Sequence, residues 1–197
     1  RHVYAATNLG RDKVVLVRMN PATCEELEVL YEHDQYDISS IAYSLKRKKL
    51  LAVYCQGHRE PIRHYFDEAE AAFRQQLKSF FPGKRFGITA TDKEEQKYLI
   101  YVGGDRTRGA YYYYDKQEPQ PIKLAETAPW LHEEDLVEMH DVTYTTRDGL
   151  TIEAYLSLPL PYTPETAKNL PVIIHPHGGH RARDTWGYSS EVQFLCN

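Results

Sequence analysis

Alternation of apolar and polar residues runs through the first two thirds of the chain and predicts short β-strands. Residues 3–20, 51–67 and 99–115 share one layout. Each stretch has an apolar strand, a polar loop that contains glycine and arginine, and a second strand. The closing residue is asparagine in the first stretch and aspartate in the other two, and it recurs about every 48 residues, a period typical of propellers and other repeat architectures.

Four further segments extend these repeats with strand-like sequences: residues 27–33, 38–44, 86–92 and 121–126. Four short antiparallel strands form one blade of a β-propeller. A single blade cannot cover both of its faces and therefore needs neighbours. We expect residues 1–126 to form about two to three blades of a partial β-propeller.

One insert, residues 67–81, replaces the strand pattern with a helical one. Its apolar residues recur at helical spacing: Ala69, Ala72, Phe73, Leu77 and Phe80. Asp67 stands where an N-cap is expected, and Glu70 and Arg74 are one turn apart. Pro82 and Gly83 end the pattern. The sequence predicts a structural helix on the outside of a blade.

The pattern changes after residue 126. Residues 127–140 are polar without alternation and are interpreted as a domain linker. Two alternating segments then flank Arg147, Asp148 and Gly149, a strong signal for a hairpin. The apolar run 170–174 suits a strand covered on both faces, as in a parallel sheet, and a serine-capped helix is expected from Ser189 or Ser190. We therefore expect residues 141–197 to begin an α/β domain, which makes the fold class mainly β plus α/β.

Composition narrows the classes of function. The chain has 197 residues, of which 42% are hydrophobic, and it can bury a real core in one or two domains. Its net charge is −4 without a long basic run, so no nucleic-acid partner is expected. No apolar run reaches the roughly 20 residues of a membrane helix. The 3 cysteines match no zinc spacing, and no cofactor is expected.

The segment from His175 to His180 reads His-Pro-His-Gly-Gly-His and has three interpretations. Three histidines can form an open zinc site, but Pro176 and the glycines disfavour a regular strand face. A nucleophile is a second candidate, because residues 187–191 resemble half of a G-x-S-x-G elbow. That stretch lacks the final glycine and a preceding buried strand, which favours a helix cap for Ser189 or Ser190.

An oxyanion loop is the third interpretation. In α/β-hydrolases a glycine-rich loop after the third strand supplies a backbone N–H to the oxyanion. Glycines allow unusual backbone angles and a close approach to substrate. His177, Gly178 and Gly179 follow a third predicted strand, residues 171–175, so strand order and motif agree.

Four stretches carry a resemblance that covers nearly the whole chain: GGDRTRGAYYYYD, YTTRDGLTIEAYLSLP, NLPVIIHPHGG and ARDTWGYSSEVQFL. On these residues the chain resembles the prolyl oligopeptidase family of serine peptidases, in particular its acylaminoacyl-peptidase-like and dipeptidyl-peptidase-like bacterial branch. The resemblance implies a β-propeller that caps an α/β-hydrolase domain and admits only peptides or small substrates. It also implies a Ser-Asp-His triad, with Gly179 N–H as oxyanion donor, Gly178 allowing the turn and His177 orienting the loop.

The sequence departs from the family in two places. His180 stands where the family usually has proline, and the triad is expected beyond Asn197, because chain order in this fold is Ser, Asp, His. We therefore expect an internal fragment, starting at Arg1 without a visible native N-terminus, that is inactive by itself. The compartment stays open, and a homo-oligomer of the full-length protein is compatible with the sequence.

Two alternatives to the peptidase remain at this point: a non-catalytic β-propeller interaction protein, and an esterase-like α/β-hydrolase that shares the glycine loop. Four charged residues lie near suggestive segments and are interpreted as solvated or structural: Arg106, Arg108, Arg183 and Asp184. Peptide specificity is not readable from these residues.

Overall fold

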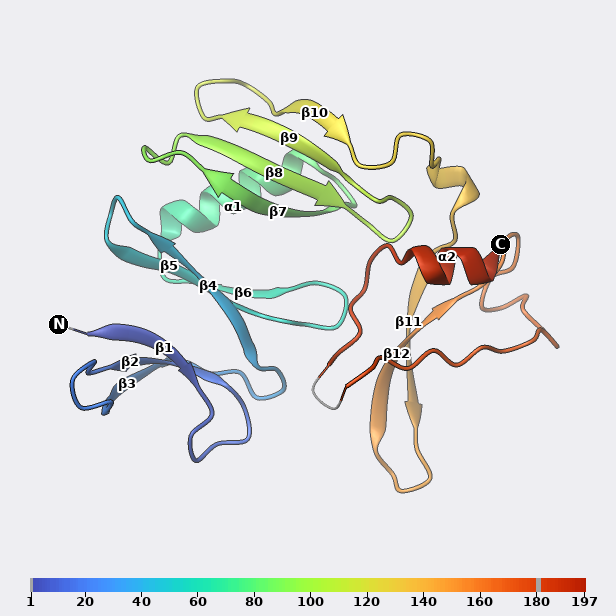
Figure 1. Ribbon diagram of the computed structural model, residues 1–197, viewed down its shortest axis with the longest axis horizontal. Coiled ribbons are helices and arrows are strands. Elements are labelled where there is room, and N and C mark those ends of the chain that lie inside the picture. The colour runs from blue at the N-terminus through green and yellow to red at the C-terminus, as the bar shows by residue number, and fades with distance from the viewer. Residues whose placement is uncertain (1, 180–181) are drawn as a thin grey trace. The chain divides into compact units, whose positions relative to one another are not determined.

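Up to residue 126 the chain consists mainly of short antiparallel strands, as the alternating sequence predicts, and one helix lies among them (Figure 1). The computed structural model describes residues 2–179 and 182–197. The chain divides into two units, Arg1–Ser79 and Phe80–Asn197. The predicted segments 27–33, 38–44, 86–92 and 121–126 each contain a strand.

The first unit contains two three-stranded antiparallel sheets. The first sheet has the order β1-β2-β3, from β1 (Val3–Thr7), β2 (Val15–Met19) and β3 (Glu26–Tyr31). The second has the order β4-β5-β6, from β4 (Ile38–Ser44), β5 (Lys49–Cys55) and β6 (Ile62–Tyr65). The central strands β2 and β5 are the most buried ones, and both are rich in valine and leucine, which suit a pleated surface covered by neighbours.

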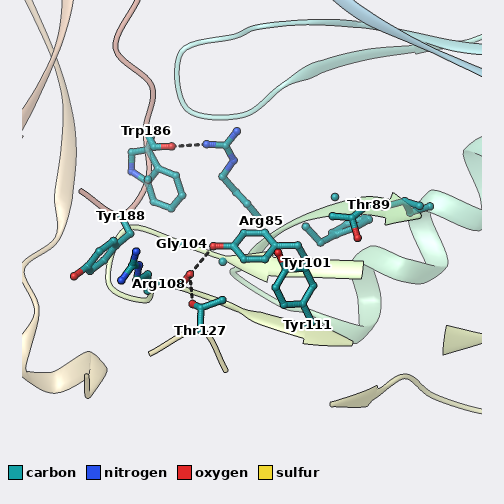
Figure 2. Close-up of a pocket in the computed structure, with 14 residues that line it drawn as sticks. Arg85, Thr89, Tyr101, Gly104, Arg108, Tyr111, Thr127, Trp186 and Tyr188 are labelled. Atoms are coloured by element: carbon teal, nitrogen blue, oxygen red, sulfur yellow. Dashed lines mark hydrogen bonds between the residues drawn. The ribbon is translucent and has the colours of Figure 1, made fainter. Parts of the chain in front are cut away.

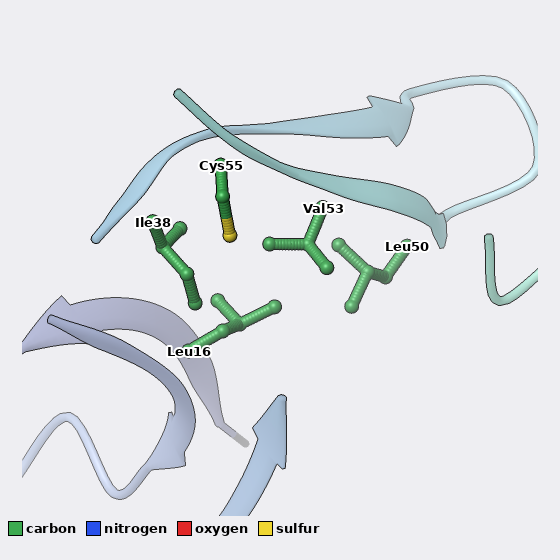
Figure 3. Close-up of a cluster of buried hydrophobic side chains, with 5 residues drawn as sticks. All are labelled: Leu16, Ile38, Leu50, Val53 and Cys55. Carbon is green, nitrogen blue, oxygen red and sulfur yellow. The ribbon is translucent and has the colours of Figure 1, made fainter. Parts of the chain in front are cut away.

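A hydrophobic cluster joins the two sheets of the first unit (Figure 3). It consists of Leu16 from β2 with Ile38, Leu50, Val53 and Cys55 from β4 and β5. Two hydrogen bonds also connect the two sheets next to this cluster. Ile38 N donates to Val14 O at 3.2 Å, and Val14 N donates to the Asp37 carboxylate at 2.6 Å. Sheet-on-sheet packing of this kind is how one repeat covers the face of the next.

The predicted helix is confirmed as α1, Glu68–Phe80. Asp67 caps it, because its carboxylate accepts a hydrogen bond from Glu70 N at 2.9 Å. The predicted pair one turn apart is present, with Arg74 Nε 2.7 Å from a Glu70 carboxylate oxygen. Helix formers such as alanine, glutamate and glutamine fill this segment, so a helix follows β6 where the other repeats continue with strand sequence.

The second unit contains the one four-stranded sheet found among residues 2–179 and 182–197. Its order is β10-β9-β8-β7, from β7 (Arg85–Thr91), β8 (Lys97–Gly103), β9 (Ala110–Asp115) and β10 (Ile122–Glu126). Tyr98, Ile100 and Val102 alternate on the buried face of β8. The two phenylalanines at and after the end of α1 contact this sheet: Phe80 lies 5.5 Å from Tyr114, and Phe81 lies 4.9 Å from Tyr112, measured between ring centroids.

The predicted linker is partly packed in the structure. A short 3-10 helix covers Glu133–Asp135, and Leu136 and Val137 are buried. The strand β11 (Met139–Thr145) begins inside the predicted linker and pairs with β12 (Thr151–Ser157). Gly149 has φ +85° at the turn, a conformation that glycine adopts without strain, and the predicted Asp-Gly hairpin is thus confirmed.

The last element of the chain is the helix α2 (Ser190–Cys196). Ser189 caps this helix, because its hydroxyl accepts a hydrogen bond from Val192 N at 3.3 Å.

The cysteines are free thiols: Cys24 is exposed, Cys55 is buried and Cys196 is intermediate. No helix within the described ranges 2–179 and 182–197 has the length and apolar character needed to span a membrane.

Candidate oxyanion loop and its supports

The predicted strand 171–175 is not formed in the structure. Residues 171–177 have no regular secondary structure, and Val172, Ile173 and Ile174 are 79%, 61% and 81% exposed. A strand of a parallel sheet requires neighbouring strands that accept its backbone hydrogen bonds and cover its faces. No strand of the described chain pairs with this segment. The prediction of a strand is therefore wrong for this structure, although the segment has the apolar sequence of a buried strand.

The two glycines of the candidate loop have open surroundings. Gly179 has φ +75°, and no atom lies within 4 Å of the position that a Cβ would take at Gly178 or Gly179. A side chain at Gly179 would strain the backbone, while the space around it would admit one. The backbone of the loop is therefore accessible to a molecule that approaches it.

The histidines of the loop make weak contacts. His177 Nδ1 lies 3.4 Å from the carbonyl oxygen of Gly178, its neighbour in the chain. His175 Nε2 lies 3.4 Å from a carboxylate oxygen of Glu191 in the first turn of α2. His180 lies outside the described residues. In the described part of the chain, no three His, Cys, Asp or Glu side chains gather as metal ligands would.

The chain downstream of the loop is firmly anchored. Trp186 is buried and donates its indole N–H to the carbonyl oxygen of Met139 at 2.9 Å. The Arg85 guanidinium lies 5.6 Å from the centre of the Trp186 ring and donates a hydrogen bond to its carbonyl oxygen. Gln193 of α2 is buried and bonds to the backbone of Val137. These contacts fix the segment after the loop to the four-stranded sheet and to the start of β11.

A cavity of about 900 Å³ lies between the exposed face of this sheet and residues 186–188 (Figure 2). Its lining combines aromatic rings with two guanidinium groups: Phe86, Tyr101, Tyr111, Trp186, Tyr188, Arg85 and Arg108. One wall is held by the carbonyl oxygen of Arg108, which accepts hydrogen bonds from the hydroxyls of Tyr101 and Thr127. Burial raises the pKa of Tyr101 above its ordinary value, so this phenol stays a neutral donor.

The charged residues singled out from the sequence have mostly structural contacts. Arg106 donates from Nε to the carbonyl oxygen of Glu133 at 3.0 Å, and Arg183 pairs with Glu153 at 2.9 Å. Arg108 lines the cavity, and Asp184 is exposed. The predicted cap at Ser189 is confirmed, which uses the hydroxyl as a hydrogen-bond acceptor for the helix.

Sequence reasoning missed three residues that organise this region: Asp105, Trp186 and Gln193. Their contacts reach 34 to 88 residues along the chain, so no local periodicity reveals them. The local pattern of α2 points the other way, because the apolar Phe194 and Leu195 are exposed while the polar Gln193 is buried.

No protein-family model matches the chain, but two known proteins are related to it in sequence. Dipeptidyl aminopeptidase BIII of Pseudoxanthomonas mexicana is 25% identical over 202 residues, which cover 99% of this chain and 28% of that protein. Dipeptidyl peptidase family member 6 of Caenorhabditis elegans is 24% identical over 193 residues, which cover 88% of this chain and 26% of that protein. The chain spans about a quarter of the length of these relatives.

A solved structure shares the fold. Prolyl oligopeptidase B from Galerina marginata, bound to a 35mer hydrolysis and macrocyclization substrate, superposes with a TM-score of 0.52 at 16% identity. The match covers 80% of this chain and 22% of that one. The sheets of the chain correspond to the β-propeller region of that protein.

Proposed function

We propose that the chain is part of a serine peptidase of the prolyl oligopeptidase family that hydrolyses short peptides, because its sequence relatives are named as dipeptidyl peptidases and a prolyl oligopeptidase shares its fold. The observation that carries the proposal is the alignment with a dipeptidyl aminopeptidase over 99% of the chain. Both curated relatives are named as peptidases, which favours this function over an esterase or a non-catalytic propeller.

In this proposal the chain contributes parts of two domains. Residues 1–126 are blades of a propeller, residues 127–140 connect them to the next domain, and residues 141–197 begin an α/β-hydrolase domain. Three successive antiparallel sheets support the first part. A hairpin, a glycine loop and a capped helix, in that order, support the second.

The proposed chemical role of the chain is to supply half of the catalytic apparatus. His177, Gly178 and Gly179 form the oxyanion loop, with the N–H of Gly179 as the donor to the tetrahedral intermediate. The positive φ of Gly179 and the open space around both glycines support this role. The nucleophilic serine, the aspartate and the histidine lie outside residues 1–197, so the chain alone has no peptidase activity.

A loop substitution in the complete protein tests the oxyanion role. Gly179→Ala introduces a side chain where φ is +75° and shifts the N–H that we assign to the oxyanion. Since losing one such donor costs about 10²–10³ in rate, we expect kcat to fall roughly 10- to 100-fold with a smaller change in KM. The measurement is steady-state hydrolysis of a fluorogenic dipeptide substrate.

Gly83→Ala is the matched control, because Gly83 has φ +71° and equally open surroundings but lies just after α1. It should keep the kcat of the unsubstituted protein. Equal activity of the two variants would remove the oxyanion role from Gly179. Failure of the complete protein to react with a fluorophosphonate probe would overturn the serine peptidase itself.

A further inference from the structure

A buried side-chain amide holds the last helix in place. Gln193 of α2 is 6% exposed and makes three hydrogen bonds. Its side-chain oxygen accepts from Val137 N at 2.9 Å, and its side-chain nitrogen donates to Val137 O at 2.8 Å and to Asp105 O at 3.2 Å. The amide thus binds both backbone groups of one residue, as a neighbouring strand would. A buried amide satisfied in this way is compatible with one arrangement of its partners.

The backbone of Met139, two residues further on, is held in the same manner. Its N–H donates to the Asp105 carboxylate at 2.8 Å, and its carbonyl oxygen accepts from the Trp186 indole at 2.9 Å. Three side chains from distant parts of the chain therefore bind four backbone groups at the start of β11. We call this set, Asp105, Trp186 and Gln193 with the backbone of Val137 and Met139, the β11 clamp.

The helix held by the clamp also contacts the candidate oxyanion segment. Glu191 lies two residues before Gln193, and its carboxylate is 3.4 Å from His175 Nε2. His175 in turn lies two residues before His177. Contacts therefore run from Asp105, which follows β8, through Gln193 and α2 to His175, which lies two residues before the candidate loop of His177, Gly178 and Gly179.

We propose that Gln193 is a positioning residue that fixes α2 to the end of the four-stranded sheet, and that α2 in turn positions the segment at His175 that leads into the oxyanion loop. This role rests on the proposed function, whereas the clamp itself does not. An apolar residue would fill the same buried space without hydrogen bonds, so the amide serves to specify geometry. A displacement of about 1 Å in catalytic geometry can cost about 10²-fold in rate, which makes such anchoring consequential.

Tryptophan fluorescence tests the clamp without any assay of activity. The chain has 2 tryptophans, and Trp130 is 69% exposed while Trp186 is 5% exposed. In a Trp130→Phe background, emission therefore reports on Trp186 alone. Gln193→Glu keeps the size but replaces the donor to Val137 O and Asp105 O with a carboxylate oxygen. We expect the emission to move to longer wavelength and quenching by acrylamide to increase.

Gln75→Glu is the matched control, because Gln75 is exposed on α1 and receives the same change of charge. It should leave Trp186 emission unchanged. Unchanged emission in Gln193→Glu would overturn the clamp. If Gln193→Glu does not fold, Asp105→Asn gives the milder test, since it alters one bond of the clamp, to Met139 N, and should shift the same emission by a smaller amount.

Kinetics of the complete protein tests the positioning role. With active sites counted by a fluorophosphonate probe, Gln193→Glu should lower kcat per active site about 10- to 100-fold while KM stays near its original value. A loss of active sites with unchanged kcat per site would show a merely structural residue and overturn the role. Absence of hydrolysis by the unsubstituted protein would overturn the proposed function and this role together, while the fluorescence result would still decide the clamp.

Discussion

At the scale of single residues, the carboxylate of Asp67 makes contacts with both α1 and β5. It caps α1 through Glu70 N and accepts ion pairs from Arg47 at 3.1 Å and Lys49 at 2.8 Å, the latter at the start of β5. These contacts lower the pKa of Asp67 from 3.8 to about 2, with the hydrogen bond from Lys49 as the largest cause. The ionised form is therefore the one that the fold stabilises.

This lowered pKa predicts a loss of stability in acid. Because the folded pKa lies below the unfolded one, the contribution is fully present above pH 3.8 and disappears as the pH falls towards about 2. Asp67→Asn keeps an acceptor for the cap but removes the charge, and should make the free energy of unfolding less dependent on pH in this range.

Asp67→Ala also loses the cap and should lower the free energy of unfolding by about 1 to 2 kcal/mol. Urea unfolding followed by helical circular dichroism, at neutral pH and near pH 3, provides the measurement. An acid-induced loss of equal size in Asp67→Asn and the unsubstituted chain would contradict the assignment.

Gly109 occupies a position at which no side chain would fit. Its φ is +93°, and a Cβ there would lie 2.5 Å from the Tyr101 hydroxyl and 2.7 Å from Val102 O. The close approach lets the chain turn from β8 into β9 against the Tyr101 ring. Both the backbone angle and the space therefore require glycine.

At the scale of elements, the sheets are held together by a few central side chains rather than by their edges. Leu16 of β2 is 1% exposed and contacts residues of the second sheet, whereas Leu9 in the loop after β1 is 78% exposed. Burial of a leucine side chain is worth about 1.5–3 kcal/mol, and removing it also leaves a cavity. The packing of one repeat on the next thus depends on such positions.

Leu16→Ala should accordingly lower the free energy of unfolding of the first unit by about 2–5 kcal/mol. Leu9→Ala makes the same chemical change at an exposed site and should alter the free energy by less than about 0.5 kcal/mol. Denaturant titration of both variants compares them directly. Similar midpoints for the two variants would show that the cluster around Leu16 does not carry the packing of the sheets.

At the scale of the whole chain, the largest departure from ordinary burial is the apolar run before the glycine loop. Val172, Ile173 and Ile174 form a contiguous exposed apolar stretch. Contiguous exposed apolar residues with unpaired backbone promote association between molecules. We expect the 197-residue chain to self-associate through this run.

Ile174→Thr should therefore slow self-association, measured by static light scattering against concentration. Leu45→Thr is the matched control, because Leu45 is 82% exposed in the turn after β4 while Ile174 is 81% exposed in the run. The control should scatter light as the unsubstituted chain does. If both variants reduce scattering equally, general surface hydrophobicity rather than this run causes the association.

Local patterns were sufficient to predict most elements. Alternation located the strands, alanine and glutamate spacing with Asp67 located α1, and Asp-Gly located the hairpin of β11 and β12. They failed where an element depends on distant partners: residues 171–175 have the composition of a strand but no pairing strand. For the same reason the clamp residue Gln193 was not predicted, because its partners Asp105 and Val137 are distant in sequence. The loop of His177, Gly178 and Gly179 could be proposed from sequence because its chemistry lies in consecutive residues.

The position of Cys55 provides a way to observe how the first unit opens. Its thiol is 0% exposed inside the cluster between the two sheets, and burial raises its pKa above the ordinary value. Cys24 lies exposed in the same unit. A thiol reagent should therefore modify Cys24 at once and Cys55 only when the sheets separate, so that the ratio of the two rates gives the free energy of opening between neighbouring repeats.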